Sequence, residues 1–205
     1  MVREVVVVRT GTANVASVMA ALSRAGARPR ESSDPREVED ARLGGLPGGG
    51  TRGAAMAGRE RGRLGGPLAG RVSAGRPLLA ICLGMQMLCD GSEESPGVAA
   101  VCAARGVATR FAGGVSIPQL GWNAVEADPG CRVLESGWAY FANSYKLDAV
   151  PAGWHGALSD HGGRFVAAME RGPVVACQFH PELSGGWGLA LIERWLAAGS
   201  ATCSP

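Results

Sequence analysis

The amino-terminal part of the chain has the pattern of alternating strands and helices. A continuous apolar run at residues 5–8 has the length of a buried strand, and turn-forming residues follow it. Apolar residues then recur at helical spacing from residue 15 to residue 22, in a helix that Asn14 can cap and Gly26 can end. This order predicts the opening of an α/β unit that contains a parallel strand.

A second strand and helix are predicted around residue 80. Residues 77–81 form the strand, and the helix begins at Leu83 with Met85, Leu88 and Cys89 on its inner face. Residues 42–50 could add another strand, but the adjacent glycines at 44 and 45 weaken that prediction.

Beyond residue 105 the pattern changes to short strand-like runs at hairpin-like intervals. They lie at residues 107–111, 122–125, 139–147, 165–169 and 174–179. In the last helical stretch, Leu189, Ile192 and Leu196 fall on one stripe. We therefore expect one α/β domain over residues 1–205, with a mixed, mainly parallel central sheet flanked by helices.

Composition and charge narrow the classes of function. The chain has 205 residues, of which 46% are apolar and 19% charged, and its net charge is +2, which argues against nucleic acid as a partner. No signal peptide or apolar run of roughly 18 residues is present, so we expect a soluble, cytoplasmic protein without a membrane contact. The six cysteines lack the spacing of metal ligands. We predict neither a metal nor a cofactor.

Cys82 is the candidate nucleophile. Small residues stand two positions before it, at Ala80, and two positions after it, at Gly84, which is what a sharp turn from strand to helix requires. At the amino terminus of a helix, unpaired N–H groups favour the thiolate form. Taken alone, a cysteine in this place is more often a small buried residue at the end of a strand than a nucleophile.

His180 and Glu182 supply what Cys82 lacks. They stand two positions apart, so in an extended segment both side chains lie on one face and the carboxylate can orient the imidazole. The imidazole can then exchange a proton with the thiol, which completes a Cys-His-Glu triad. The other two histidines, His155 and His161, fall in a loop-like region and are interpreted as surface residues.

The segment LPGGGTRGAAM is a candidate oxyanion hole. Its glycines let backbone N–H groups approach a ligand, and each such donor contributes about 10²- to 10³-fold in rate. A phosphate-binding loop is the competing interpretation, but no lysine follows the glycines, so the full nucleotide signature is missing. A simple turn is the third interpretation.

Five segments together resemble the class I (triad) glutamine amidotransferases, in order and over the whole chain. They are LPGGG, ICLGMQMLCDGSEES, PQLGWN, YFANSYKL and CQFHPELSG. CLGMQ with SEES downstream narrows the resemblance to the glutaminase subunit of imidazole glycerol phosphate synthase. The resemblance implies a flavodoxin-like fold in which Cys82 attacks the side-chain amide of L-glutamine and His180 protonates the departing ammonia.

The resemblance also implies a partner and further site residues. The partner is a (β/α)₈-barrel cyclase subunit in a heterodimer, which receives the ammonia to make imidazole glycerol phosphate and aminoimidazole carboxamide ribotide for histidine biosynthesis. Carried over by position, the substrate-binding residues are Gln86, Glu94 and Ser144, the oxyanion hole is formed around Gly49, Gly50 and Leu83, and the residues facing the cyclase are Asn14, Trp122, Asn123 and Tyr140.

Several positions depart from the family pattern. They are Arg9, Gly49, Gln119, Asn143 and Leu183. Leu183 replaces a basic residue that is thought to help gate the exit of ammonia. Gly49 replaces a bulkier residue, and since glycine accepts positive φ freely, we expect the resting enzyme to be less tightly silenced.

Three rival functions stay open. They are a glutaminase subunit of another synthase, a cysteine hydrolase of the DJ-1 type, and a binding subunit without turnover.

Overall fold

The computed structural model describes residues 3–9, 15–48, 54–94 and 101–201, without the side chains of 54–62. The helices are α1 (Val15–Arg24), α2 (Pro35–Asp40), α3 (Ala54–Ser73), α4 (Leu83–Met87) and α5 (Gly185–Ala201), with one 3₁₀ turn, η2 (Pro181–Leu183). The strands are β1 (Arg3–Val8), β2 (Ala27–Ser32), β3 (Gly44–Leu46), β4 (Leu78–Ile81), β5 (Gly91–Ser92), β6 (Val107–Arg110), β7 (Gln119–Ala127), β8 (Gly137–Asn143), β9 (Tyr145–Lys146), β10 (His155–Asp160), β11 (Arg164–Arg171) and β12 (Val174–Cys177).

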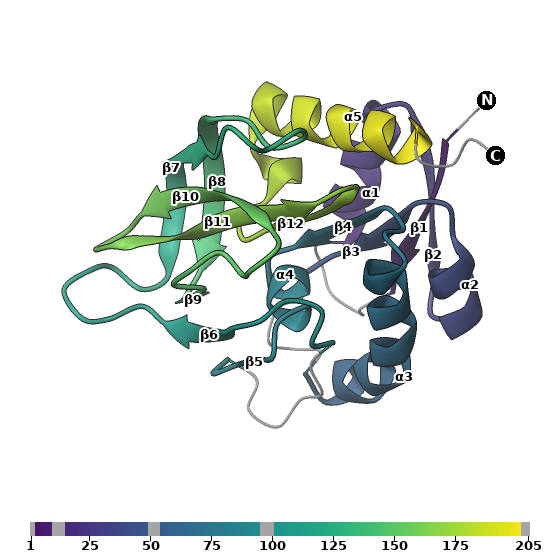
Figure 1. Cartoon of the computed structure of the whole chain (residues 1–205), viewed down its shortest axis with the longest axis horizontal. Helices are drawn as coiled ribbons and strands as arrows, with labels where there is room; N and C mark the ends of the chain where they lie inside the picture. Colours follow the sequence, from purple (N-terminus) through teal and green to yellow (C-terminus); the bar gives the residue numbers. More distant parts are fainter. Residues whose placement is uncertain (1–2, 10–14, 49–53, 95–100, 202–205) are drawn as a thin grey trace.

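One large mixed sheet forms the centre of the molecule (Figure 1). Its strands follow the order β2-β1-β3-β4-β12-β11-β10-β7-β8. Pairing is parallel from β2 to β12 and antiparallel from β12 to β8. The short strands β5, β6 and β9 form a separate small sheet. This arrangement confirms the predicted α/β class.

Helices cover both faces of the parallel half. Helices α1 and α5 lie on one face, where Val5 and Val7 of β1 contribute to the core, and α2, α3 and α4 lie on the other, which receives Val6 and Val8 (Figure 1). Because successive side chains of a strand point to opposite faces, the unbroken valine run fills both layers. None of the helices in the described ranges is long and apolar enough to cross a lipid bilayer.

The structure corrects some of the element predictions. The region that holds His155 is not a loop, because His155 begins β10, although its side chain is exposed as predicted. This strand was missed because its inner positions carry small or polar residues, such as Ala157 and Ser159, in place of the usual branched ones. Strand β2 was missed because it is an edge strand with a mostly polar sequence.

Two other predictions needed adjustment. The predicted run 139–147 is divided at Ser144 into β8 and β9, which belong to different sheets. In α5, Leu189 is only half-buried, and Leu191 and Trp195 join Ile192 and Leu196 in the core. The buried surface of α5 is therefore wider than one stripe, because this helix packs closely over the sheet.

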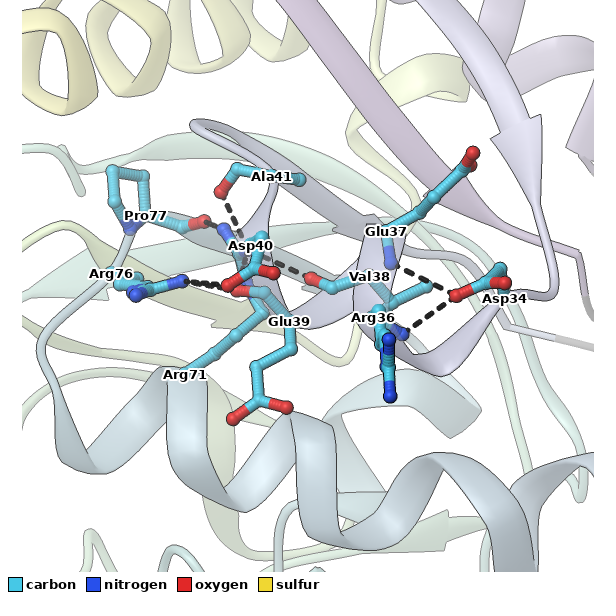
Figure 2. Close-up of polar contacts among 10 residues, drawn as sticks. All are labelled: Asp34, Arg36, Glu37, Val38, Glu39, Asp40, Ala41, Arg71, Arg76 and Pro77. Atoms are coloured by element: carbon cyan, nitrogen blue, oxygen red, sulfur yellow. Dashed lines mark hydrogen bonds and ion pairs between the residues drawn. The ribbon is translucent and has the colours of Figure 1, made fainter.

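A buried arginine of α3 bonds to the end of α2 and to the residue before β4 (Figure 2). The Arg71 side chain is fully buried and its guanidinium donates to the carbonyls of Val38, Glu39 and Ala41 at the end of α2, at 2.7–3.0 Å. It also donates to the Pro77 carbonyl, just before β4, at 2.6 Å. Carbonyls at a helix end lack partners within the helix, so Arg71 satisfies several buried acceptors at once.

We expect Arg71→Met to lower the free energy of unfolding by roughly 3 kcal/mol or more, since methionine leaves these buried carbonyls unsatisfied. Urea denaturation measures the change. Arg63→Met is the matched control, because Arg63 is an exposed residue of the same helix, and it should change stability by no more than about 0.5 kcal/mol. Similar losses in the two variants would contradict this account of Arg71.

Candidate active site

Cys82 lies at the turn between β4 and α4, as predicted. Its backbone has φ 52° and ψ −112°, and residues other than glycine rarely adopt a positive φ. The Cys82 amide donates to the Cys177 carbonyl at 2.6 Å, which ties the turn to the neighbouring parallel strand β12. Such strain in a non-glycine residue is characteristic of functional turns, where surrounding structure holds it in place.

Glycines on both sides give this turn the room it needs. A Cβ on Gly84 would lie 2.3 Å from the carbonyl oxygen of Leu46 at the end of β3, so only glycine fits there. A Cβ on Gly48 would lie 2.9 Å from the Ile81 carbonyl oxygen and 3.0 Å from Cys82 Cβ. The loop after β3 therefore packs directly against the turn of Cys82, and the sequence prediction did not include this contact of Gly48.

His180 and Glu182 follow β12, next to the turn of Cys82. His180 Nδ1 lies 2.7 Å from Glu182 Oε1, and both residues are buried. The predicted contact is present, but the predicted extended geometry is wrong. His180 has an extended backbone and Glu182 lies in the 3₁₀ turn η2, because β12 ends at Cys177 and Pro181 begins a tight turn.

The charge state of His180 is set by its two partners. Burial alone would lower its pKa, but hydrogen bonds and charge interactions with Cys82 and Glu182 outweigh that effect and raise the pKa to about 10. By contrast, burial raises the pKa of the Cys89 thiol to about 12 and that of the Cys131 thiol to about 11. The arrangement therefore favours the imidazolium form of His180, while the Cys89 and Cys131 thiols stay neutral.

A hydrogen-bonded clamp fixes the backbone of His180 to strand β8. The His180 amide donates to the Tyr140 carbonyl at 2.9 Å, and the Tyr140 amide donates to Ser184 Oγ at 2.9 Å. The Ser184 hydroxyl in turn donates to the His180 carbonyl at 2.7 Å. His180 is therefore held by the same strand segment that carries Tyr140, and sequence analysis did not identify Ser184.

The predicted substrate-binding residues lie in different environments. Gln86 is buried in α4, and its amide contacts Gln178 and Ser92. Glu94 is exposed just beyond β5. Ser144 is half-buried between β8 and β9, with its carbonyl accepting from the Phe111 amide. Their predicted contacts with glutamine stay predictions.

Three of the residues predicted to face the cyclase, Trp122, Asn123 and Tyr140, divide between the two faces of the β7–β8 hairpin. Trp122 and Tyr140 are directly paired across β7 and β8, with ring centroids 6.2 Å apart in an edge-to-face arrangement. Trp122 is 54% exposed. Asn123 is the next residue along the strand, so it points to the other side, where Nδ2 donates to the Asp160 carbonyl at 2.6 Å.

Further apolar residues, which were not predicted, lie on the same face of this hairpin as Trp122 and Tyr140. Leu120 pairs with Ala142, and Ala124 pairs with Trp138, on either side of the Trp122–Tyr140 pair. Leu120 is 69% and Trp138 61% exposed. Alternation of apolar residues at Leu120, Trp122 and Ala124 of β7 could have indicated this face in the sequence, whereas β8 is apolar at nearly every position.

The remaining predictions concern the oxyanion hole, Asn14 and metal binding. Gly49, Gly50 and Asn14 lie outside the described residues, whereas Leu83, the third predicted oxyanion residue, begins α4 beside Gly48. Within the described part of the chain, no cluster of histidine, cysteine or acidic side chains could hold a metal ion.

This geometry defines a class of protein. A thiol on a strained turn, an imidazole that reaches both the thiol and a carboxylate, and glycine-lined backbone beside them are the parts of a cysteine nucleophile site for acyl transfer. Acyl transfer to a thiol forms a thioester, which water can then cleave.

Comparisons with known proteins agree with this class. The family model described as glutamine amidotransferase class-I matches residues 67–196. The chain is 40% identical over 198 residues to the imidazole glycerol phosphate synthase subunit HisH of Deinococcus radiodurans, covering 94% of this chain and 92% of that protein. It is 33% identical to the chloroplastic imidazole glycerol phosphate synthase hisHF of Arabidopsis thaliana, covering 91% of this chain and 33% of that protein.

A solved structure described as a glutamine amidotransferase has the same fold, with a TM-score of 0.74 at 20% identity over 95% of this chain and 98% of that one. The chain belongs to the class I glutamine amidotransferases and, within them, to the family of the HisH subunit of imidazole glycerol phosphate synthase. These similarities do not favour a glutaminase of another synthase or a DJ-1-type hydrolase.

Proposed function

We propose that this protein hydrolyses glutamine to glutamate and ammonia and supplies the ammonia to a cyclase subunit in histidine biosynthesis. One observation carries the chemical part of the proposal. His180 interacts with the Cys82 thiol and, at 2.7 Å, with the Glu182 carboxylate, so one imidazole connects a nucleophile to an orienting acid.

The reaction begins at Cys82. Its thiolate attacks the side-chain carbonyl carbon of glutamine, and the carbonyl oxygen becomes an oxyanion that backbone N–H groups around Gly49, Gly50 and Leu83 would stabilise. Protonated His180 gives its proton to the leaving nitrogen, so ammonia departs and a γ-glutamyl thioester remains on Cys82.

Water completes the reaction. Neutral His180 takes a proton from a water molecule, which attacks the thioester and releases glutamate and the thiolate. Throughout the cycle Glu182 accepts a hydrogen bond from Nδ1, which leaves the other ring nitrogen of His180 to exchange protons. Gln86, Glu94 and Ser144 would bind the amino-acid end of the substrate.

The partner in this proposal is a (β/α)₈-barrel cyclase in a heterodimer. The relative in D. radiodurans is named as a subunit of a synthase, and this chain matches only 33% of the longer A. thaliana synthase. The outer face of the β7–β8 hairpin, with Leu120, Trp122 and Trp138 exposed, has the large apolar side chains typical of a stable interface. The clamp at Ser184 connects the strand of this face to His180.

The experiment that tests this function measures glutamate formation with and without a barrel cyclase subunit and its nucleotide ligand. We expect strong stimulation by the cyclase in wild type. Trp122→Ala should weaken cyclase binding about 30-fold or more, because exposed tryptophans at the centre of an interface often contribute 2 kcal/mol or more.

Val107→Ala is the matched control, since Val107 is 49% exposed on β6, outside the hairpin. It should leave stimulation unchanged. Equal glutamate formation with and without the cyclase, or equal loss in the two variants, would contradict the proposed partner.

A further inference from the structure

A chain of hydrogen bonds approaches Cys82 from the side of α4. Gln178 is fully buried directly after β12, and its Nε2 lies 3.6 Å from Cys82 Sγ, within hydrogen-bonding range of a sulfur acceptor. Gln86 Nε2 donates to Gln178 Oε1 at 3.2 Å, and Ser92 Oγ donates to Gln86 Oε1 at 2.9 Å. Three side chains from three elements therefore connect in series to the nucleophile.

In this series of hydrogen bonds, each side chain donates to the next one in the direction of the Cys82 sulfur. Ser92 Oγ accepts the Glu94 amide at 3.2 Å and uses its own hydrogen for the Gln86 carbonyl. This contact leaves the Gln86 amino group to face Gln178, whose carbonyl accepts it and whose amino group then faces Cys82. Bonds aligned in one direction polarise one another, and the effect is larger in a buried site.

We propose that Gln178 stabilises the Cys82 thiolate by donating a hydrogen bond to the sulfur, and that Gln86 and Ser92 are positioning residues that hold the Gln178 amide in the donating orientation. The inference rests on the proposed role of Cys82 as nucleophile. This positioning role is compatible with substrate binding by Gln86. Each amide side chain in the hydrogen-bonded series keeps one further donor hydrogen and one further acceptor site.

Burial of the Gln178 amide indicates which form of Cys82 this contact favours. A neutral amide costs free energy to bury unless both ends are bonded, and in Gln178 the carbonyl meets Gln86 while the amino group meets the sulfur. A hydrogen bond is stronger when its acceptor is charged, so the contact favours thiolate over thiol. On the other side of Cys82, His180 is hydrogen-bonded both to the thiol and to Glu182, and the nearby Cys177 thiol stays neutral because burial raises its pKa.

The test measures the rate of Cys82 alkylation by iodoacetamide against pH, with mass spectrometry to identify the labelled peptide. Gln178→Met keeps the size of the side chain but removes the donor. It should move the midpoint of the profile upward by about one pH unit and lower kcat for glutamine about tenfold. Gln119→Met is the matched control, because Gln119 is also buried but lies on β7, and it should leave the midpoint unchanged.

Ser92→Ala keeps the test decisive if Gln178→Met fails to fold. It removes only a hydroxyl at a half-buried position and should move the midpoint in the same direction by a smaller amount. An unchanged midpoint in folded Gln178→Met, or in Ser92→Ala where the first variant does not fold, would overturn the proposal. Alkylation needs no glutamine, so a midpoint that moves without any wild-type glutaminase activity would contradict only the proposed function.

Discussion

Replacing Cys82 by alanine is expected to lower kcat for glutamine hydrolysis at least about 10⁴-fold, because removal of the nucleophile leaves only binding and oxyanion stabilisation. Steady-state glutamate formation in the presence of the cyclase measures the loss. The fold should remain, since Cys82 is only partly buried and alanine fits at the turn, although φ 52° strains either residue.

Cys131→Ala is the control for the loss of a thiol. Cys131 is also partly buried, but burial and the neighbouring carboxylates of Glu170 and Asp128 raise its pKa to about 11, so it is protonated at neutral pH. We expect kcat within about twofold of wild type for this variant, as for a substitution away from the site. Residual activity of Cys82→Ala close to that of Cys131→Ala would exclude the triad mechanism.

Gly84→Ala should produce the second largest loss. The new Cβ would lie 2.3 Å from the Leu46 carbonyl oxygen, and both atoms are fixed by backbone, so the turn and β3 must move apart. Displacement of a reacting group by about 1 Å can cost about 10²-fold in rate, and we expect at least that loss in kcat. Unfolding in urea should show a free energy lower by about 1–3 kcal/mol, as for other overpacked sites.

Gly65→Ala is a control of opposite sign. Gly65 lies in α3, and a Cβ there would meet nothing within 4 Å. Alanine in a helix interior is favoured over glycine by about 1 kcal/mol, so this variant should be more stable than wild type with unchanged kcat. Wild-type kcat in Gly84→Ala would show that the close approach of β3 to the turn has no catalytic role.

The nucleophile turn could be predicted from sequence because its signal is local. Ala80, Cys82 and Gly84 lie within one short segment, and the apolar strand before them sets where the turn falls. The contact between His180 and Glu182 was also predicted, but for an incorrect geometric reason. Spacing alone did not reveal that Pro181 converts the segment to a 3₁₀ turn, although the sequence contains that proline.

The supporting contacts could not be predicted because they depend on which strands are neighbours. Gln178 meets Cys82 only because β12 pairs in parallel with β4, and Ser184 meets Tyr140 only because the chain after β12 passes beside the middle of β8. Residues this far apart carry no shared spacing in the sequence. Arg71 is a similar case, since nothing local distinguishes it from Arg63, an exposed arginine of the same helix.

The most direct test of the central claim is acid quenching of the enzyme during turnover with glutamine, followed by mass spectrometry of its peptides. The account predicts a mass increase of one γ-glutamyl group on the peptide that contains Cys82, absent from Cys82→Ala. Cys102 is an exposed thiol in the same protein and serves as an internal control. Glutamine turnover without a γ-glutamyl adduct, or with the adduct on Cys102, would contradict the assignment of Cys82 as nucleophile.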